Sequence, residues 1–262
     1  MKIQFYPYDF EYKVKDDKTY VYMYSKLEDG TKICVKHESC AFFYAEKNIT
    51  IEVPNRNEIA KVMHTEPIEM DLLGKKINVF KIYTNSPKSV SILAKEFSQK
   101  GIKTYEQNIL FIHRYLRDLQ ITPMTLVEAE GEFVNSTKYR VPLFLADKVK
   151  DIGKEANHQW KILAVDIETY AKKKEIDPHK NPILMIAFYG VNEAGEIYKK
   201  VLTWKRFPHK LDYLEVVSDE VEMLKRFREI VLDYQPDIIT GYFSDGFDFP
   251  YINTRAEKYH VN

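Results

Sequence analysis

Polar and apolar residues alternate along much of the first half of the chain, as they do in half-buried strands. Tyr20–Tyr24 and Lys32–Lys36 flank a turn at Glu28-Asp29-Gly30, and this arrangement predicts a β-hairpin. Ala41–Ala45 and Ile77–Tyr83 have the same character and predict two further strands. The first half is therefore expected to be rich in β-structure.

Three helices are predicted among these strands. The apolar spacing indicates them at Arg56–His64, at Ser89–Lys100 and at Ile109–Arg117. The second is expected to begin near Pro87 and to end at Gly101, since these residues favour helix starts and stops. From about 118 to 157 the pattern is irregular. We predict a small β-rich α+β domain over residues 1–155.

The second half predicts an α/β unit over residues 156–262. Strands are expected at Lys161–Glu168, Ile183–Val191 and Glu196–Trp204, followed by a helix with Ser218 as its N-cap. Pro236 ends that helix. A further strand is expected at Asp237–Tyr242 and a last helix at Tyr251–His260. The predicted order is three antiparallel strands, then a crossover helix, then a strand that lies beside the first strand. This is the order of a ribonuclease-H-like fold.

Acidic side chains follow two of these strands. The apolar run Ile162–Val165 predicts a strand covered on both faces, and Asp166 and Glu168 come at its end. Side chains two apart on a strand share a face, so the two carboxylates project together. Asp248 follows the later strand and its Ser244-Asp-Gly246 turn. Three converging carboxylates suit Mg²⁺ or Mn²⁺ and a two-metal phosphodiester hydrolysis.

These segments resemble the first two motifs of the 3′→5′ proofreading exonuclease in B-family DNA polymerases, above all the archaeal ones. The resemblance is carried by Lys161–Thr169, Pro236–Tyr251, Trp204, Tyr213–Phe227, Met70–Lys76 and Ile112–Leu116. It implies an N-terminal domain followed by the first part of a ribonuclease-H-like exonuclease domain. It also implies that Asp166, Glu168 and Asp248 are the catalytic metal ligands for Mg²⁺ or Mn²⁺, with Glu168 helping to orient the attacking water.

The chain departs from the family pattern in two ways. A third exonuclease motif, Tyr-x-x-x-Asp, is expected well beyond Asn262, so we expect a truncated domain that is inactive alone. The family usually has Tyr-Asn at the start of the second motif, where the Asn touches the primer end. Here the pair is Tyr242-Phe243, and Phe243 offers only stacking. Tyr242, Phe243 and Phe247 are the DNA-binding candidates, although Phe247 also fits a core position and Tyr242 suits packing or primer contact equally.

The resemblance implies a second site, because archaeal B-family polymerases capture template uracil in an N-terminal pocket. Its wall here would be Tyr12, Ala41, Phe42, Pro87, Val90, Phe111 and Arg114. The family has Pro where this chain has Ala41 and Leu110, and Asp where it has Ser89. Phe42, Val90 and Phe111 also suit an ordinary core, and Arg114 suits a phosphate contact or a salt bridge.

Composition limits the remaining possibilities. The 262 residues include 39 Lys and Arg against 39 Asp and Glu, so nucleic-acid contacts must come from local patches such as Lys172-Lys-Lys174. Cys34 and Cys40 are read as reduced thiols of a cytoplasmic, nucleoid-associated prokaryotic protein. No membrane partner is expected. The expected partners are DNA, the remainder of the polymerase chain and a sliding clamp bound through the missing part.

The sequence thus predicts the N-terminal and proofreading-exonuclease portion of a family B DNA-directed DNA polymerase that acts in replication. Two alternatives stay open at this point. One is a stand-alone 3′→5′ exonuclease of the same fold. The other is a non-catalytic module that binds single-stranded DNA or uracil through the aromatic residues of its N-terminal domain.

Overall fold

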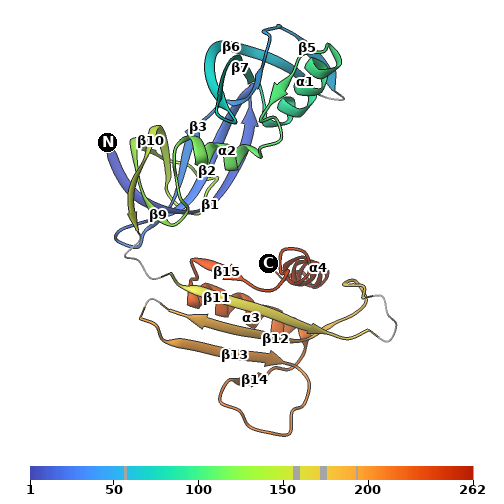
Figure 1. Cartoon of the computed structure of the whole chain (residues 1–262). Helices are drawn as coiled ribbons and strands as arrows, with labels where there is room; N and C mark the ends of the chain where they lie inside the picture. Colours follow the sequence, from blue (N-terminus) through green and yellow to red (C-terminus); the bar gives the residue numbers. More distant parts are fainter. Residues whose placement is uncertain (56–57, 156–159, 172–175, 193, 262) are drawn as a thin grey trace. The chain divides into compact units, whose positions relative to one another are not determined.

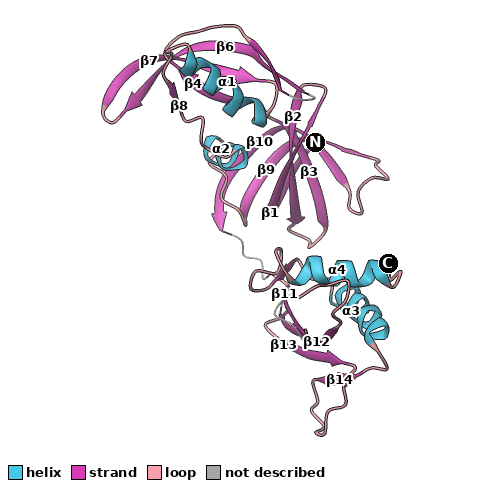
Figure 2. Cartoon of the chain, turned by 90° about the vertical axis from the view of Figure 1, so that its right-hand side faces the viewer, coloured by secondary structure: helices cyan, strands magenta, loops and turns pink. Residues whose placement is uncertain are grey.

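The structure is a computed structural model that describes residues 1–55, 58–155, 160–171, 176–192 and 194–261. It divides into two compact units, Met1–Ala156 and Asn157–Asn262, next to the boundary predicted near residue 155. Each unit combines sheets with few helices, and the predicted mixed fold class is confirmed (Figures 1 and 2). Within the described ranges, no helix is long and apolar enough to cross a membrane.

Five strands of the first unit close into a barrel in the order β1-β2-β3-β10-β9. Their bounds are β1 (Lys2–Lys15), β2 (Lys18–Leu27), β3 (Lys32–Glu38), β9 (Thr125–Val134) and β10 (Leu143–Glu155). β3 and β10 are parallel, and the other neighbours are antiparallel. Alternate side chains point inward, so Phe5, Met23 and Phe144 are fully buried. Helix α2 (Phe111–Asp118) contacts the barrel through the Tyr115 hydroxyl, 2.9 Å from His37 Nδ1.

A second sheet in this unit has the order β5-β6-β7-β4-β8. Its strands are β4 (Ala41–Ala45), β5 (Glu52–Asn55), β6 (Glu58–Leu72), β7 (Lys75–Thr84) and β8 (Thr104–Tyr105). Helix α1 (Pro87–Gln99) packs on it, with Leu93 and Phe97 fully buried. Ser86 caps the helix by accepting a hydrogen bond from Ser89 N at 3.2 Å. The predicted hairpin, the strands at 41–45 and 77–83, and helices α1 and α2 are confirmed.

Two predictions for this unit are wrong. The segment predicted as a helix at Arg56–His64 belongs largely to strand β6, which pairs with β5 and β7. Its β-branched residues Ile59 and Val62 fit either structure locally, and the long-range pairing with β7 selects the strand. The stretch from 118 to 157, predicted to be irregular, contains β9 and β10, whose pairing closes the barrel.

The second unit is a five-stranded sheet in the order β14-β13-β12-β11-β15. Its elements are β11 (Ile162–Thr169), β12 (Ile183–Val191), β13 (Ile197–Thr203), β14 (Leu214–Val216), α3 (Glu220–Tyr234), β15 (Ile238–Thr240) and α4 (Asp248–Lys258). β15 runs parallel to β11, so the predicted crossover order is confirmed. Figure 1 shows α3 behind the sheet, where Met223 and Leu224 join the buried core.

Three details of this unit differ from the predictions. The N-cap of α3 is Asp219 rather than Ser218, since the Asp219 carboxylate accepts from Glu222 N at 2.8 Å. Strand β14 was not predicted. β11 is covered on one face rather than two: Leu163 and Val165 are buried, whereas Ile162 is 38% exposed. The helices pack on one face of the sheet, which explains the difference.

Candidate functional site

Asp166 and Glu168 lie in the last part of β11, on the face of the sheet opposite the helix layer. Both are exposed, while the intervening Ile167 and the preceding Val165 are buried. Their cross-strand partners on β12 are Ala187 for Asp166 and Met185 for Glu168. The two carboxylates therefore share one open face, as the alternation of side chains along a strand requires.

Asp248 belongs to helix α4 and contacts the same part of β11. It is the first residue of α4, is only 3% exposed, and its Oδ1 accepts a hydrogen bond from Ile167 N at 3.1 Å. That amide belongs to the residue between Asp166 and Glu168. The structure thus anchors the third predicted carboxylate to the backbone between the first two.

The end of β15 explains how this contact forms. β15 pairs with β11 only as far as Thr240, which faces Ala164, so the edge of β11 beyond that point is left for other donors and acceptors. Gly241 then runs against β11 so closely that an added Cβ would lie 2.5 Å from Val165 O. A side chain there would displace the turn that leads into α4 and Asp248.

The donor set of the site fits a hard divalent cation. All three side chains are carboxylates, and oxygen ligands are what Mg²⁺ and Mn²⁺ prefer. Asp248 uses one carboxylate oxygen for Ile167 N, and Asp166 and Glu168 are open to solvent. Among the described residues, however, no group of three or more His, Cys, Asp or Glu side chains is gathered closely enough to hold a metal ion.

Sequence comparisons identify the family of the chain. The family described as DNA polymerase family B, exonuclease domain, matches residues 102–262. The chain belongs to DNA polymerase family B. DNA polymerase 1 of Pyrococcus abyssi is 32% identical over 252 residues, covering 95% of this chain and 26% of that protein. The DNA polymerase of Thermococcus kodakarensis is 30% identical over 255 residues, covering 96% of this chain and 12% of that protein.

A solved structure shares the fold. The family B DNA polymerase from the hyperthermophilic archaeon Pyrobaculum calidifontis superposes with a TM-score of 0.75 at 22% identity. The match covers 99% of this chain and 33% of that one. The resemblance to archaeal B-family polymerases is thereby confirmed, and the chain spans about a quarter or less of the length of the two curated relatives named above.

The DNA-binding candidates of the second family B motif differ in exposure. Tyr242 is 95% exposed and Phe243 is 72% exposed, so neither belongs to the core. Phe247 packs against the core and has its ring 5.5 Å from that of Tyr251, which favours the core interpretation. Lys172-Lys-Lys174, a predicted phosphate patch, lies outside the described residues.

Phe243 has an unusual backbone for a bulky residue, with φ at +58°. Its carbonyl accepts from Gly246 N and Phe247 N, both at 3.0 Å, and its ring lies over Gly246, where an added Cβ would be 2.3 Å away. Asn, the usual family B residue here, adopts this left-handed conformation more readily.

Phe243→Asn is therefore expected to raise the free energy of unfolding of the second unit by about 1 kcal/mol. Both tryptophans, Trp160 and Trp204, belong to this unit, so their fluorescence during urea unfolding isolates it. Phe243→Ala is the matched control, since it loses the ring without gaining the conformational preference. If the Asn variant is no more stable than the Ala variant, the conformational preference of Asn contributes nothing at this position; if both variants are less stable than the wild type, the contact of the Phe243 ring with Gly246 outweighs the backbone effect.

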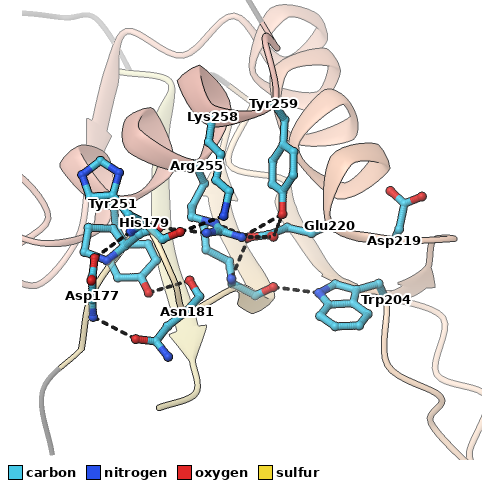
Figure 3. Close-up of polar contacts among 12 residues, drawn as sticks. Asp177, His179, Asn181, Trp204, Asp219, Glu220, Tyr251, Arg255, Lys258 and Tyr259 are labelled. Carbon is cyan, nitrogen blue, oxygen red and sulfur yellow. Dashed lines mark hydrogen bonds and ion pairs between the residues drawn. The ribbon is translucent and has the colours of Figure 1, made fainter. Parts of the chain in front are cut away.

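A buried ion pair holds the site together, and Figure 3 shows it between Arg255 of α4 and Glu220 of α3. Nη2 and Nε of Arg255 donate to the two oxygens of Glu220 at 2.5 and 2.8 Å, and the side chains are 2% and 6% exposed. Its hydrogen bond to Glu220 raises the pKa of Arg255. Glu220 also accepts from Ile183 N at 2.8 Å, and Arg255 donates to Pro178 O at 2.9 Å.

This network was missed from the sequence. It ties α4, which carries Asp248, to the start of α3 and to the segment entering β12. A signal was present: Asp248, Ile252 and Arg255 recur at helical spacing, so all three fall on the buried face of α4.

The residues predicted to form a uracil pocket line one cavity of about 440 Å³ in the first unit. Its walls include all seven predicted positions, namely Tyr12, Ala41, Phe42, Pro87, Val90, Phe111 and Arg114. The rings of Tyr12 and Phe111 meet edge to face at 5.2 Å.

The Arg114 side chain is buried and contacts other residues of the first unit. It is 3% exposed, forms a salt bridge with Glu106 at 3.0 Å, and stacks 4.3 Å from the Phe42 ring centroid. Burial raises the pKa of Glu106, but hydrogen bonds from Arg117 and Arg114 outweigh it and hold the pKa below its usual value. Of the two roles considered for Arg114, a phosphate contact or a salt bridge, the structure shows the salt bridge.

Cys34 and Cys40 are both free thiols, as predicted.

Proposed function

We propose that the second unit is the first part of a proofreading exonuclease that removes the 3′-terminal nucleotide of DNA within a longer, parent family B polymerase. The observation that carries the proposal is the hydrogen bond from Ile167 N to Asp248, which brings the third carboxylate to the strand bearing Asp166 and Glu168. Membership of family B, with the exonuclease domain matched, supports it.

In this proposal Asp166, Glu168 and Asp248 hold Mg²⁺ or Mn²⁺, which when bound activates a water and stabilises the leaving oxygen of a phosphodiester. Glu168, exposed on the open face, orients the attacking water. The buried Asp248 is fixed by Ile167 N and by α4, so its carboxylate is preorganised. Tyr242 and Phe243 offer exposed rings on which the terminal base stacks.

The test is degradation of 5′-labelled single-stranded DNA by the parent polymerase, with Mg²⁺, with Mn²⁺ and with a chelator. Stepwise shortening from the 3′ end that requires the metal is the expected result. Absence of shortening with both metals would reject the exonuclease. DNA and the remainder of the polymerase chain are the partners in this proposal, and a sliding clamp stays a prediction.

We also propose that the cavity of the first unit captures uracil in template DNA. The support is that the seven predicted wall residues lie around a single cavity. Thymine differs from uracil by a C5 methyl group. In this proposal the wall at Val90 and Phe111, both of which line the cavity, closes around the base and excludes that methyl group. Ala41 in place of the family proline widens the wall and weakens this discrimination.

A single strand containing one deoxyuridine is therefore expected to bind more tightly than the same strand with thymidine. Overpacking one methyl group costs about 1–3 kcal/mol, which corresponds to about five- to 150-fold in affinity, and Ala41 places the preference at the low end. Fluorescence anisotropy at matched salt measures it. Equal affinities would remove the uracil assignment and leave the exonuclease untouched.

A further inference from the structure

The outer face of the barrel is unused by both proposed sites. Numbered along the chain, its five strands pair in the order 1-2-3-5-4, the third and fifth are parallel, and α2 lies between the third and fourth. This matches the five-stranded oligonucleotide-binding barrel. Such barrels bind oligonucleotides or oligosaccharides on the face of the second and third strands, between the loops that join strands 1–2 and 4–5.

Here that face carries a row of tyrosines. Tyr22 is buried at its centre, in a small cluster with Cys34 and Leu143, and the half-buried Tyr20 and Tyr24 flank it. Tyr20, Tyr22 and Tyr24 alternate along β2 with Val21 and Met23, which are fully buried inside the barrel. The loop of residues 135–142, between β9 and β10, folds back over the row. In this loop Tyr139 stacks on Tyr22, with ring centroids 5.9 Å apart and an interplanar angle of 27°. We call Tyr20, Tyr22, Tyr24 and Tyr139 the tyrosine face.

Cations are interleaved with these rings. Lys36 of β3 has its Nζ 3.7 Å from the Tyr20 centroid, and Lys13 of β1 has its Nζ 5.1 Å from that of Tyr22. Burial lowers the pKa of Lys36, and repulsion from Lys15 and Lys138 adds to it. Lys15 and Lys138 thus lie near Lys36 at this point of the face, with Glu38 as the opposing charge.

Two acidic residues near the tyrosine face, Glu11 and Glu38, form ion pairs with lysines. Glu11 accepts a hydrogen bond from the Tyr24 hydroxyl at 2.6 Å and pairs with Lys13 at 2.8 Å. Glu38 pairs with Lys18 at 3.0 Å. These contacts offset the acids at the edge of the face, whereas Lys36 sits over the aromatic row.

We propose that the tyrosine face binds single-stranded DNA. Bases stack on Tyr20 and Tyr139, while Lys36 and the exposed Lys138 and Arg140 of the loop contact phosphates. The interleaved cations favour a nucleic acid over a neutral oligosaccharide, the other ligand class of such barrels. The site is separate from the cavity of the first unit, because neither the tyrosine face nor Lys36 lines that cavity.

The test is anisotropy of a labelled oligothymidylate with the 262-residue chain in a chelator, which removes any exonuclease contribution. Wild type is expected to bind, and Tyr20→Ala to weaken binding by about five- to 150-fold, the effect of one lost base stack. Tyr20→Phe keeps the ring and is expected to retain the wild-type affinity. Lys36→Gln is expected to lower the slope of log affinity against log salt by about 0.7, the value for one phosphate contact on a single strand.

Tyr105→Ala is the matched control, because Tyr105 also forms a tyrosine–lysine pair, with Lys103 Nζ at 5.2 Å, but on the second sheet. Its affinity is expected to equal that of wild type. The proposal is overturned if the wild type does not bind the thymidine strand, or if Tyr20→Ala and Tyr105→Ala bind it equally. It is also overturned if a neutral oligosaccharide displaces the DNA, which would reassign the face.

Discussion

Replacing Asp166 by Ala is expected to reduce the 3′→5′ exonuclease rate of the parent polymerase on the order of 10³-fold. Asp166 is one of the three proposed metal ligands, so its loss removes one of the negative charges that would hold Mg²⁺ or Mn²⁺ at the reacting phosphate. The metals supply several kcal/mol of transition-state stabilisation, and each 1.36 kcal/mol is about tenfold in rate. Single-turnover digestion of a labelled single strand measures the change.

Asp245→Ala is the matched control for this experiment. Asp245 is an exposed acid in the turn that precedes α4, three positions before Asp248, and it has no role in the proposed site. Its variant is expected to keep the wild-type rate. Comparable loss in the two variants would mean that general acidity of this surface matters, rather than the proposed ligand set.

The 262-residue chain itself is expected to show little activity in the same assay, because the family's third motif supplies a further ligand. Robust digestion by this chain that Asp166→Ala removes would show that the third motif is dispensable or replaced. That outcome would favour a stand-alone exonuclease of the same fold, which is the alternative left open by the sequence.

Local patterns predicted the parts of this protein that local forces determine. The alternation along β2 and β3 and the capped helix α1 are fixed within a few residues of sequence, and each was found where it was predicted. The shared face of Asp166 and Glu168 follows from the two-residue period of a strand alone. The turn between Thr240 and Asp248 was likewise visible in its Ser-Asp-Gly sequence.

Features that depend on distant partners were not predictable in this way. β6 has a helix-compatible sequence and becomes a strand because β7 pairs with it. β9 and β10 have no clear pattern of their own, and they are strands because together they close the barrel. The anchoring of Asp248 depends on β15 stopping at Thr240, which leaves Ile167 N without a strand partner on that side.

Replacing Arg255 by Met is expected to lower the free energy of unfolding of the second unit by about 3–5 kcal/mol. The substitution leaves the Glu220 carboxylate buried without its bidentate partner, and a buried charge that has lost its counter-ion is strongly destabilising. Urea unfolding followed by tryptophan fluorescence is a direct measurement, since both tryptophans belong to this unit and Trp204 Nε1 donates to Ile183 O, beside the pair, at 2.7 Å.

Two further variants separate the buried pair from ordinary surface charge. Arg226 of α3 pairs with Glu215 at 2.8 Å but is 32% exposed, so Arg226→Met is expected to cost less than about 1 kcal/mol. Glu220→Gln added to Arg255→Met removes the stranded charge and is expected to restore part of the lost stability, with a coupling of about 0.5–3 kcal/mol. Strictly additive losses in the double variant would mean that Arg255 stabilises the unit through packing alone. Recovery in the double variant, with Asp248 again held against Ile167, would identify the pair as the clamp that positions α4.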